Sequence, residues 1–167
     1  MLNNDLTRWR YLFCLTTMLA SGFVRETGGA EFNYDSYRPY SLAQAIADHP
    51  HQEQADWVVE AGDFKYRVRV IYTGQQRGIT ANVKQLLKHW AKTLGQDPKI
   101  PDLFGHEILV REGISQYWLP IQEPPLSFLV KEVRPGDTVE LYVVLIGTAK
   151  TEWVFAVNEF QSLKASP

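Results

Sequence analysis

Four histidines are the side chains of this sequence best suited to bind a metal ion or to transfer a proton: His49, His51, His89 and His106. Only His49 and His51 stand close together. A zinc site needs three or four converging N, O or S ligands, and one short loop with two histidines does not supply them. His106-Glu107 begins like a zincin motif, but Val110 occupies the position of its second histidine. We therefore expect solvent-exposed loop histidines, no metal site and no other cofactor.

Nucleophilic and acid–base catalysis also lack a signature in this sequence. Ser115 is followed by Gln116 and does not belong to a Gly-x-Ser-x-Gly turn. The single cysteine, Cys14, lies in an N-terminal apolar run. The carboxylates are scattered, mostly beside turns, whereas glycoside hydrolysis needs two of them about 5–10 Å apart. We expect a non-catalytic protein, and a small secreted hydrolase with a site assembled from distant residues is the alternative.

Three cations alternate with apolar residues in the segment 64–72: Lys65, Arg67 and Arg69. Period-two alternation predicts a strand with one face on a core and the other face in solvent. The cations would then form a stripe with about 7 Å between successive side chains. Such a stripe could bind an anionic ligand, for example a polyanionic glycan or single-stranded nucleic acid. An ordinary solvated strand face explains the stripe without any function and is the favoured interpretation.

Trp118 is the second candidate for ligand binding. It shares one face of its expected strand with Gln116 and Gln122. An aromatic ring beside amide side chains could stack on a sugar. The alternative is that the ring packs under the turn at residues 124–125 or under the tyrosine-rich segment near the N-terminus.

The first 24 residues have a composition of their own. Arg8 and Arg10 precede the segment 11–24, which carries no charge and ends near the small residues Ala20 and Gly22. This order is typical of a secretory signal peptide, here residues 1–22 with a second possible boundary at 30. The apolar run is shorter than the roughly 20 residues that span a bilayer, so an uncleaved anchor is the weaker alternative. We expect export to the periplasm or the extracellular space, and membrane contact only if this segment is uncleaved.

Overall composition limits the partners. The chain has 167 residues, with 17 Lys and Arg against 19 Asp and Glu, a formal charge of −2. This length suits one compact domain. The charge balance disfavours general polyanion binding and therefore nucleic acid, which leaves a glycan or another envelope protein as the expected partner.

The segment 31–56 is predicted to be an extended aromatic arm followed by a short helix. Tyr34, Tyr37 and Tyr40 are spaced by three, and Pro39 disfavours a helix before Tyr40. Ser41 can cap a helix over residues 42–48. The tyrosines could stack on a ligand or lie as a strap over the core.

One long amphipathic helix is expected between residues 80 and 95. Its apolar residues recur at the helical period and form one stripe: Val83, Leu86, Leu87, Trp90 and Leu94. Thr80 is a possible N-cap, and Gly95 is a natural stop.

The remainder of residues 57–163 is predicted to form strands. Beside 57–60 and 64–72, the candidates are 107–111, 115–122, 126–133, 139–147 and 152–160, separated by Gly- and Pro-containing turns. The run 139–146 is apolar on both faces and should be covered on both sides. The expected fold class is α+β: an antiparallel, strongly bent sheet of about seven strands, as a small barrel or sandwich, packed on one amphipathic helix.

Overall fold

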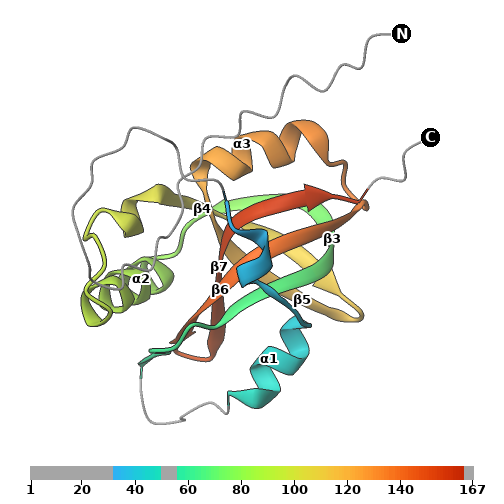
Figure 1. Ribbon diagram of the computed structural model, residues 1–167. Coiled ribbons are helices and arrows are strands. Elements are labelled where there is room, and N and C mark those ends of the chain that lie inside the picture. Colours follow the sequence, from blue (N-terminus) through green and yellow to red (C-terminus); the bar gives the residue numbers. More distant parts are fainter. Residues whose placement is uncertain (1–31, 50–55, 164–167) are drawn as a thin grey trace, which may run out of the picture.

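The computed structural model describes residues 32–49 and 56–163 (Figure 1). The expected export segment, residues 1–22, and His51 lie outside this range. The elements are, in chain order, η1 (Tyr34–Ser36), β1 (Arg38–Pro39), α1 (Leu42–Asp48), β2 (Trp57–Val59), β3 (Lys65–Gly78), α2 (Ala81–Thr93), η2 (Ile100–Leu103), β4 (Phe104–Glu112), β5 (Ser115–Gln122), α3 (Glu123–Glu132), β6 (Thr138–Ala149) and β7 (Glu152–Ser162). Within the described part of the chain, no helix has the length and apolar character needed to cross a membrane.

All seven strands belong to one mixed sheet in the order β1-β3-β4-β5-β7-β6-β2. Because β3 also pairs with β6, five strands (β3, β4, β5, β7 and β6) form a closed ring. The expectation of a purely antiparallel sheet is wrong in two places, since β1 runs parallel to β3 and β5 runs parallel to β7. Two parallel strands need a crossover connection between them. For β5 and β7 this connection consists of α3 and β6, after which the chain runs along β7 in the same direction as along β5.

Strand β3 closes the ring because it bends and changes partner. Its first half pairs with β6 from Lys65 to Ile71, and its second half pairs with β4 from Ile71 to Gly78. The ladder to β4 shifts register between Tyr72 and Gln76, and Gly74 in this irregularity has a φ of +83°. Residues 73–78, which follow the predicted strand 64–72, are therefore the bent end of β3.

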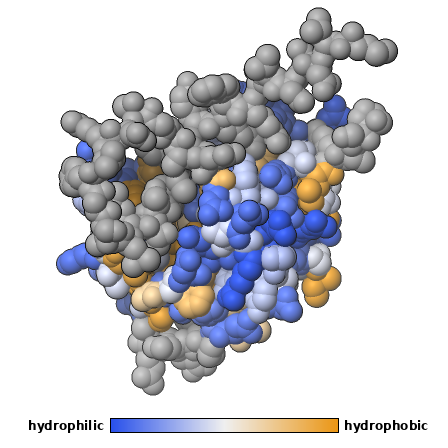
Figure 2. All heavy atoms as spheres, viewed as in Figure 1, coloured by the Kyte–Doolittle hydropathy of each residue, from blue (hydrophilic) through white to orange (hydrophobic). Residues whose placement is uncertain are grey.

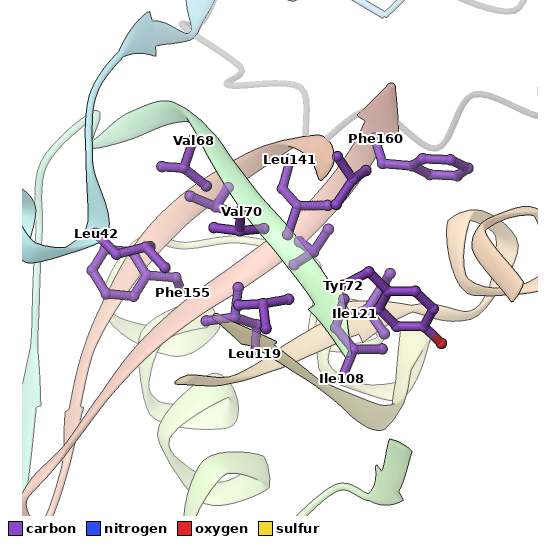
Figure 3. Close-up of a cluster of buried hydrophobic side chains, with 14 of the residues drawn as sticks. Leu42, Val68, Val70, Tyr72, Ile108, Leu119, Ile121, Leu141, Phe155 and Phe160 are labelled. Carbon is purple, nitrogen blue, oxygen red and sulfur yellow. The ribbon is translucent and has the colours of Figure 1, made fainter. Parts of the chain in front are cut away.

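The interior of the ring holds the main core (Figure 3). Tyr66 and Val68 of β3 have no exposed surface, and neither do Leu141 and Val143 of β6. This confirms the predicted alternation in β3 and the burial of the 139–146 run. In Figure 3 the labelled side chains of several strands point toward one another inside the ring, and Leu42 of α1 lies beside Phe155.

Two helices add apolar residues to this core. Leu42 and Ala45 of α1 and Leu126 and Leu129 of α3 belong to the same buried cluster as the ring interior. In Figure 1 α1 and α3 lie at opposite sides of the strands. Helix α1 and its Ser41 cap agree with the prediction, since the Ser41 side chain accepts a hydrogen bond from the Gln44 backbone N–H.

The predicted strand 126–133 is wrong, because these residues form most of α3. Pro124 and Pro125 are the second and third residues of this helix and do not break it, since backbone N–H groups in the first turn have no intrahelical partner. The buried residues Leu126, Leu129 and Val133 are spaced by three and four, which is the helical period. The sheet is therefore covered by three helices and not by one.

Helix α2 covers the outer face of β6 and β7. Its buried stripe, Val83, Leu86, Leu87 and Trp90, packs in a second cluster with Val144 and Ile146. Thr80 caps the helix by accepting from the Val83 N–H, and Gly95 follows it with a φ of +61°, both as predicted.

The aromatic arm packs as a strap over this same face. Phe32 and Tyr37 are buried, and their rings lie 5.7 Å and 5.4 Å from the ring of Tyr142. Asn158 of β7 donates a hydrogen bond of 3.0 Å to the Tyr37 hydroxyl. Tyr37 is thus part of the core and Tyr34 packs partly buried against it, which favours the strap interpretation for these two, whereas the partly exposed Tyr40 lines a surface groove.

Candidate functional site

A groove of about 640 Å³ lies on the surface beside the first half of β3. One wall is the end of β1 and the start of α1, from Pro39 to Ala43, and the other is the β4–β5 turn, from Glu112 to Ser115. Arg67, Arg69 and Glu140 also line it. Figure 2 shows the side of the molecule seen in Figure 1, and hydrophilic residues cover most of its visible centre.

A nearly buried carboxylate, Glu140, organises the charges of the groove. Arg69 donates to Glu140 Oε1 through Nε at 3.1 Å, and the Tyr142 hydroxyl donates to Oε2 at 3.2 Å. Arg67 Nε lies 3.9 Å from Oε2. Two guanidinium groups therefore face one carboxylate that is only 6% exposed, so positive charge is in excess beside Glu140, while Glu112 balances the charge of the groove lining as a whole.

Burial and the neighbouring Glu140 carboxylate raise the pKa of Tyr142 to about 12. Desolvation is the larger cause, because ionisation would leave a phenolate among the rings of the strap. Tyr142 consequently remains a hydrogen-bond donor to Glu140 over the whole neutral range.

The three cations of the predicted stripe do not share one environment. Arg67 and Arg69 line the groove, but Lys65 does not. Lys65 is paired with Asp63 at 3.0 Å, and its side chain is only 13% exposed. The three cations are evenly spaced in the sequence, but in the structure only the two arginines line the groove, and the lysine forms an ion pair elsewhere.

Trp118 lies outside the groove and contacts a cation. The guanidinium of Arg77 stands over the Trp118 ring, 4.3 Å from its centroid. Arg77 in turn donates to the buried carboxylate of Glu107 through Nε at 3.0 Å. A sugar could stack on this ring face only by displacing Arg77.

Glu112 is a groove residue that sequence reasoning missed. Its two carboxylate oxygens accept hydrogen bonds of 3.0 Å from the backbone N–H groups of Leu42 and Ala43, in the first turn of α1. This contact joins residues 70 positions apart, so no local pattern could indicate it. It fixes the two walls of the groove to each other.

The expectation that His49 is exposed is wrong, because its side chain is only 12% exposed. Its Nε2 lies 3.3 Å from the Tyr66 hydroxyl, and its Nδ1 lies 3.4 Å from Glu60 Oε2. This chain of hydroxyl, imidazole and carboxylate resembles a nucleophile with its base, but Tyr66 has no exposed surface for a substrate to reach. Among residues 32–49 and 56–163, no three metal-ligating side chains converge.

No protein-family model and no curated protein matches this sequence. Among solved structures, the chain is similar to a putative aspartyl-tRNA synthetase from Leishmania major Friedlin, with a TM-score of 0.43 and 9% sequence identity. The match covers 89% of this chain but only 24% of the synthetase chain. A likeness at this level assigns no activity.

Proposed function

We propose that this chain is an exported, non-catalytic binding module whose groove takes an anionic ligand. The observation that carries the proposal is the convergence of Arg67 and Arg69 on a groove whose interior holds one buried carboxylate, Glu140. Guanidinium groups bind carboxylate, sulfate and phosphate oxygens through paired hydrogen bonds. Arg69 is 73% exposed and donates to Glu140 through Nε, so its side chain remains accessible to a ligand.

The closed ring supports a binding role of this kind. The five strands of the ring, in their closed and partly parallel order, resemble the small five-stranded Greek-key barrel of the OB type. Such barrels bind oligonucleotides and oligosaccharides on their surfaces. A fold hosts many functions, so the choice of ligand rests on the groove and not on the barrel.

The alternative of a secreted hydrolase has less support. Acyl transfer or hydrolysis needs a nucleophile within hydrogen-bond reach of a base at an accessible surface. The described lining of the groove contains serines but no histidine. Ser41 is already engaged in capping α1.

Export rests on the sequence, because the N-terminal run and its small residues match a cleavable signal. Intact mass of the protein purified from its native host tests this. We expect a mature chain that starts near Phe23 or Glu31, lacks Cys14 and is found outside the cytosolic fraction. Full-length protein in the cytosol would overturn the export part of the proposal and leave the groove untouched.

Two substitutions on either side of one ion pair test the groove. Arg69→Gln removes a ligand-facing charge and should weaken anion binding by about tenfold, whereas Glu140→Gln removes the competing carboxylate and should strengthen it. The double variant with both changes has the same net charge as the wild-type pair. Its melting temperature shows whether a loss of binding comes from a loss of folding. Arg134→Gln, which removes an exposed arginine outside the groove, is the matched control.

The probes are a sulfated oligosaccharide, a neutral oligosaccharide and a library of short capped peptides. Binding to the groove should weaken as salt is added, since exposed charges are screened beyond about 8 Å at physiological ionic strength. If binding is insensitive to salt, unaffected by Arg69→Gln and lost in Trp118→Ala, then the Trp118 surface is the site. If no probe binds, the proposed function is wrong.

A further inference from the structure

We infer that the ligand of this groove is an extended peptide carrying an acidic side chain, which pairs with the edge of β3 at Arg69. The inference rests on the proposed function and specifies its ligand. Its first support is the direction of the backbone groups along β3. Successive residues of a strand direct their N–H and C=O groups to opposite sides.

The even-numbered residues of this part of β3 pair with β6, since the Phe64 carbonyl accepts from Leu145 and the Tyr72 N–H donates to Asp137. The odd-numbered residues face the other way. There the Arg67 carbonyl accepts from the Tyr40 N–H at 3.0 Å, and Ile71 pairs with Arg111 of β4.

Arg69 lies between these two partners. Its N–H and C=O face the gap between the end of β1 and the end of β4, which is where the groove lies. Within the described ranges of the chain, neither group has a backbone partner. A donor and an acceptor on one residue at a strand edge are the groups that an added strand pairs with.

The groove walls also fit a peptide. Pro39 and Tyr40 form an apolar surface on one side, and Ile114 stands fully exposed at the tip of the β4–β5 turn on the other. Side chains of an extended segment alternate in direction, so one can contact Ile114 while its neighbours leave the groove. An exposed isoleucine gains free energy when a partner covers it.

The two arginines of the groove favour an acidic side chain in the peptide. Arg69 lines the groove, is 73% exposed and contacts Glu140 through Nε, and Arg67 lies beside it near the same buried carboxylate. A glutamate or aspartate of the peptide can accept paired hydrogen bonds from the guanidinium of Arg69. A sulfated sugar offers the anion but no matching backbone N–H and C=O, and for this reason we assign a peptide.

The test selects binders from a library of short capped peptides, with the full mature chain as the target. Half of the library carries a central glutamate and half a central glutamine. We expect glutamate peptides rich in β-branched residues to be enriched, and the best one to bind about tenfold more tightly than its glutamine twin. N-methylation of its backbone at the paired position should abolish binding.

Two further readouts separate pairing at Arg69 from general charge attraction. The Arg69 amide should gain protection from hydrogen exchange when the peptide binds, and Ile114→Ser should weaken binding without changing the melting temperature. Glu140→Gln should tighten binding of the same peptide. Equal enrichment of glutamine peptides, or no protection at Arg69, overturns the inference.

The sulfated oligosaccharide distinguishes a failure of the peptide ligand from a failure of the proposed anion binding. If it binds in a way that depends on Arg69 and no peptide does, the anion-binding function stands and the peptide ligand is wrong. If neither binds, both are wrong.

Discussion

At the scale of single residues, the buried carboxylate of Glu140 determines what the groove can bind. It holds Arg69 at 3.1 Å and accepts a hydrogen bond from Tyr142. An unpaired carboxylate at this depth would be costly, and removing its partners leaves an uncompensated charge. Replacing both Arg67 and Arg69 by alanine should therefore lower the stability of the fold. The same two substitutions in a fully exposed stripe would leave the stability nearly unchanged.

Tyr142 gives stability a dependence on alkaline pH. Its folded pKa of about 12 lies above the ordinary value of 10.0, so only the unfolded chain loses this proton between pH 10 and 12. Its contribution is fully present below pH 10 and is lost through this window, by about 2–3 kcal/mol. Urea unfolding at a series of pH values should show a steeper fall for the wild type than for Tyr142→Phe. Parallel curves for the two proteins would contradict the burial of this hydroxyl.

A glycine is required at position 147, where β2 pairs with β6. Its φ is +140°, and an added Cβ would stand 1.8 Å from the Val58 carbonyl oxygen. Gly147→Ala should lower the free energy of unfolding by roughly 2 kcal/mol or more, since it adds a clash to a strained backbone. Gly95→Ala has a positive φ but open space, and should lose only about 1 kcal/mol. Equal losses in the two variants would show that β2 does not approach Gly147 so closely.

At the scale of elements, α3 shows how an apolar segment can be assigned the wrong structure. The residues after Pro125 are rich in Leu, Val and Phe, which are common in strands. The chain forms a helix there because it buries Leu126 and Leu129 against the ring interior and leaves Ser127 and Val130 exposed. Burial on one side of a 3.6-residue period is the feature that decides between the two structures.

Val130 of α3 tests this assignment. Its side chain is 45% exposed, so substitution changes little packing. Val130→Ala should raise the free energy of unfolding by about 0.5 kcal/mol, because alanine favours a helix more than a β-branched residue does. Val59→Ala in β2 should have the opposite sign, since valine favours a strand. A loss of stability in Val130→Ala, measured by urea unfolding, would favour the strand that we first predicted.

At the scale of the whole molecule, the ring interior and the two helices α1 and α3 share one core. Leu141 and Leu42 have no exposed surface, although they come from β6 and from α1. A shared core makes the described domain a single cooperative unit, so we expect one unfolding transition by different probes.

Leu141→Ala tests that core. A large-to-small change at a fully buried site should lower the free energy of unfolding by about 2–5 kcal/mol. Ile114→Ala, at the fully exposed tip of the β4–β5 turn, should change it by less than about 0.5 kcal/mol. Both are measured by reversible urea unfolding. A loss below about 1 kcal/mol for Leu141→Ala would mean that β6 is not central.

Elements with local sequence signals were predicted correctly. The alternation over residues 64–72 predicted the first half of β3, and the apolar stripe with Thr80 and Gly95 predicted α2, because strand and helix periods repeat within a few residues. The sequence also selected Arg67 and Arg69 as candidate ligand contacts. It could not show that Lys65, of the same stripe, lies outside the groove.

The closure of the ring, the parallel pairings and the groove depend on contacts between distant parts of the chain. The pairing of Ile121 with Val157, the cap of α1 by Glu112 and the contact of Arg69 with Glu140 join residues 36 or more positions apart. Such contacts depend on packing of the whole chain and leave no periodic pattern in the sequence. Burial of Glu140 changes two surface cations into one organised site, because a carboxylate removed from water holds its partners far more strongly than an exposed one.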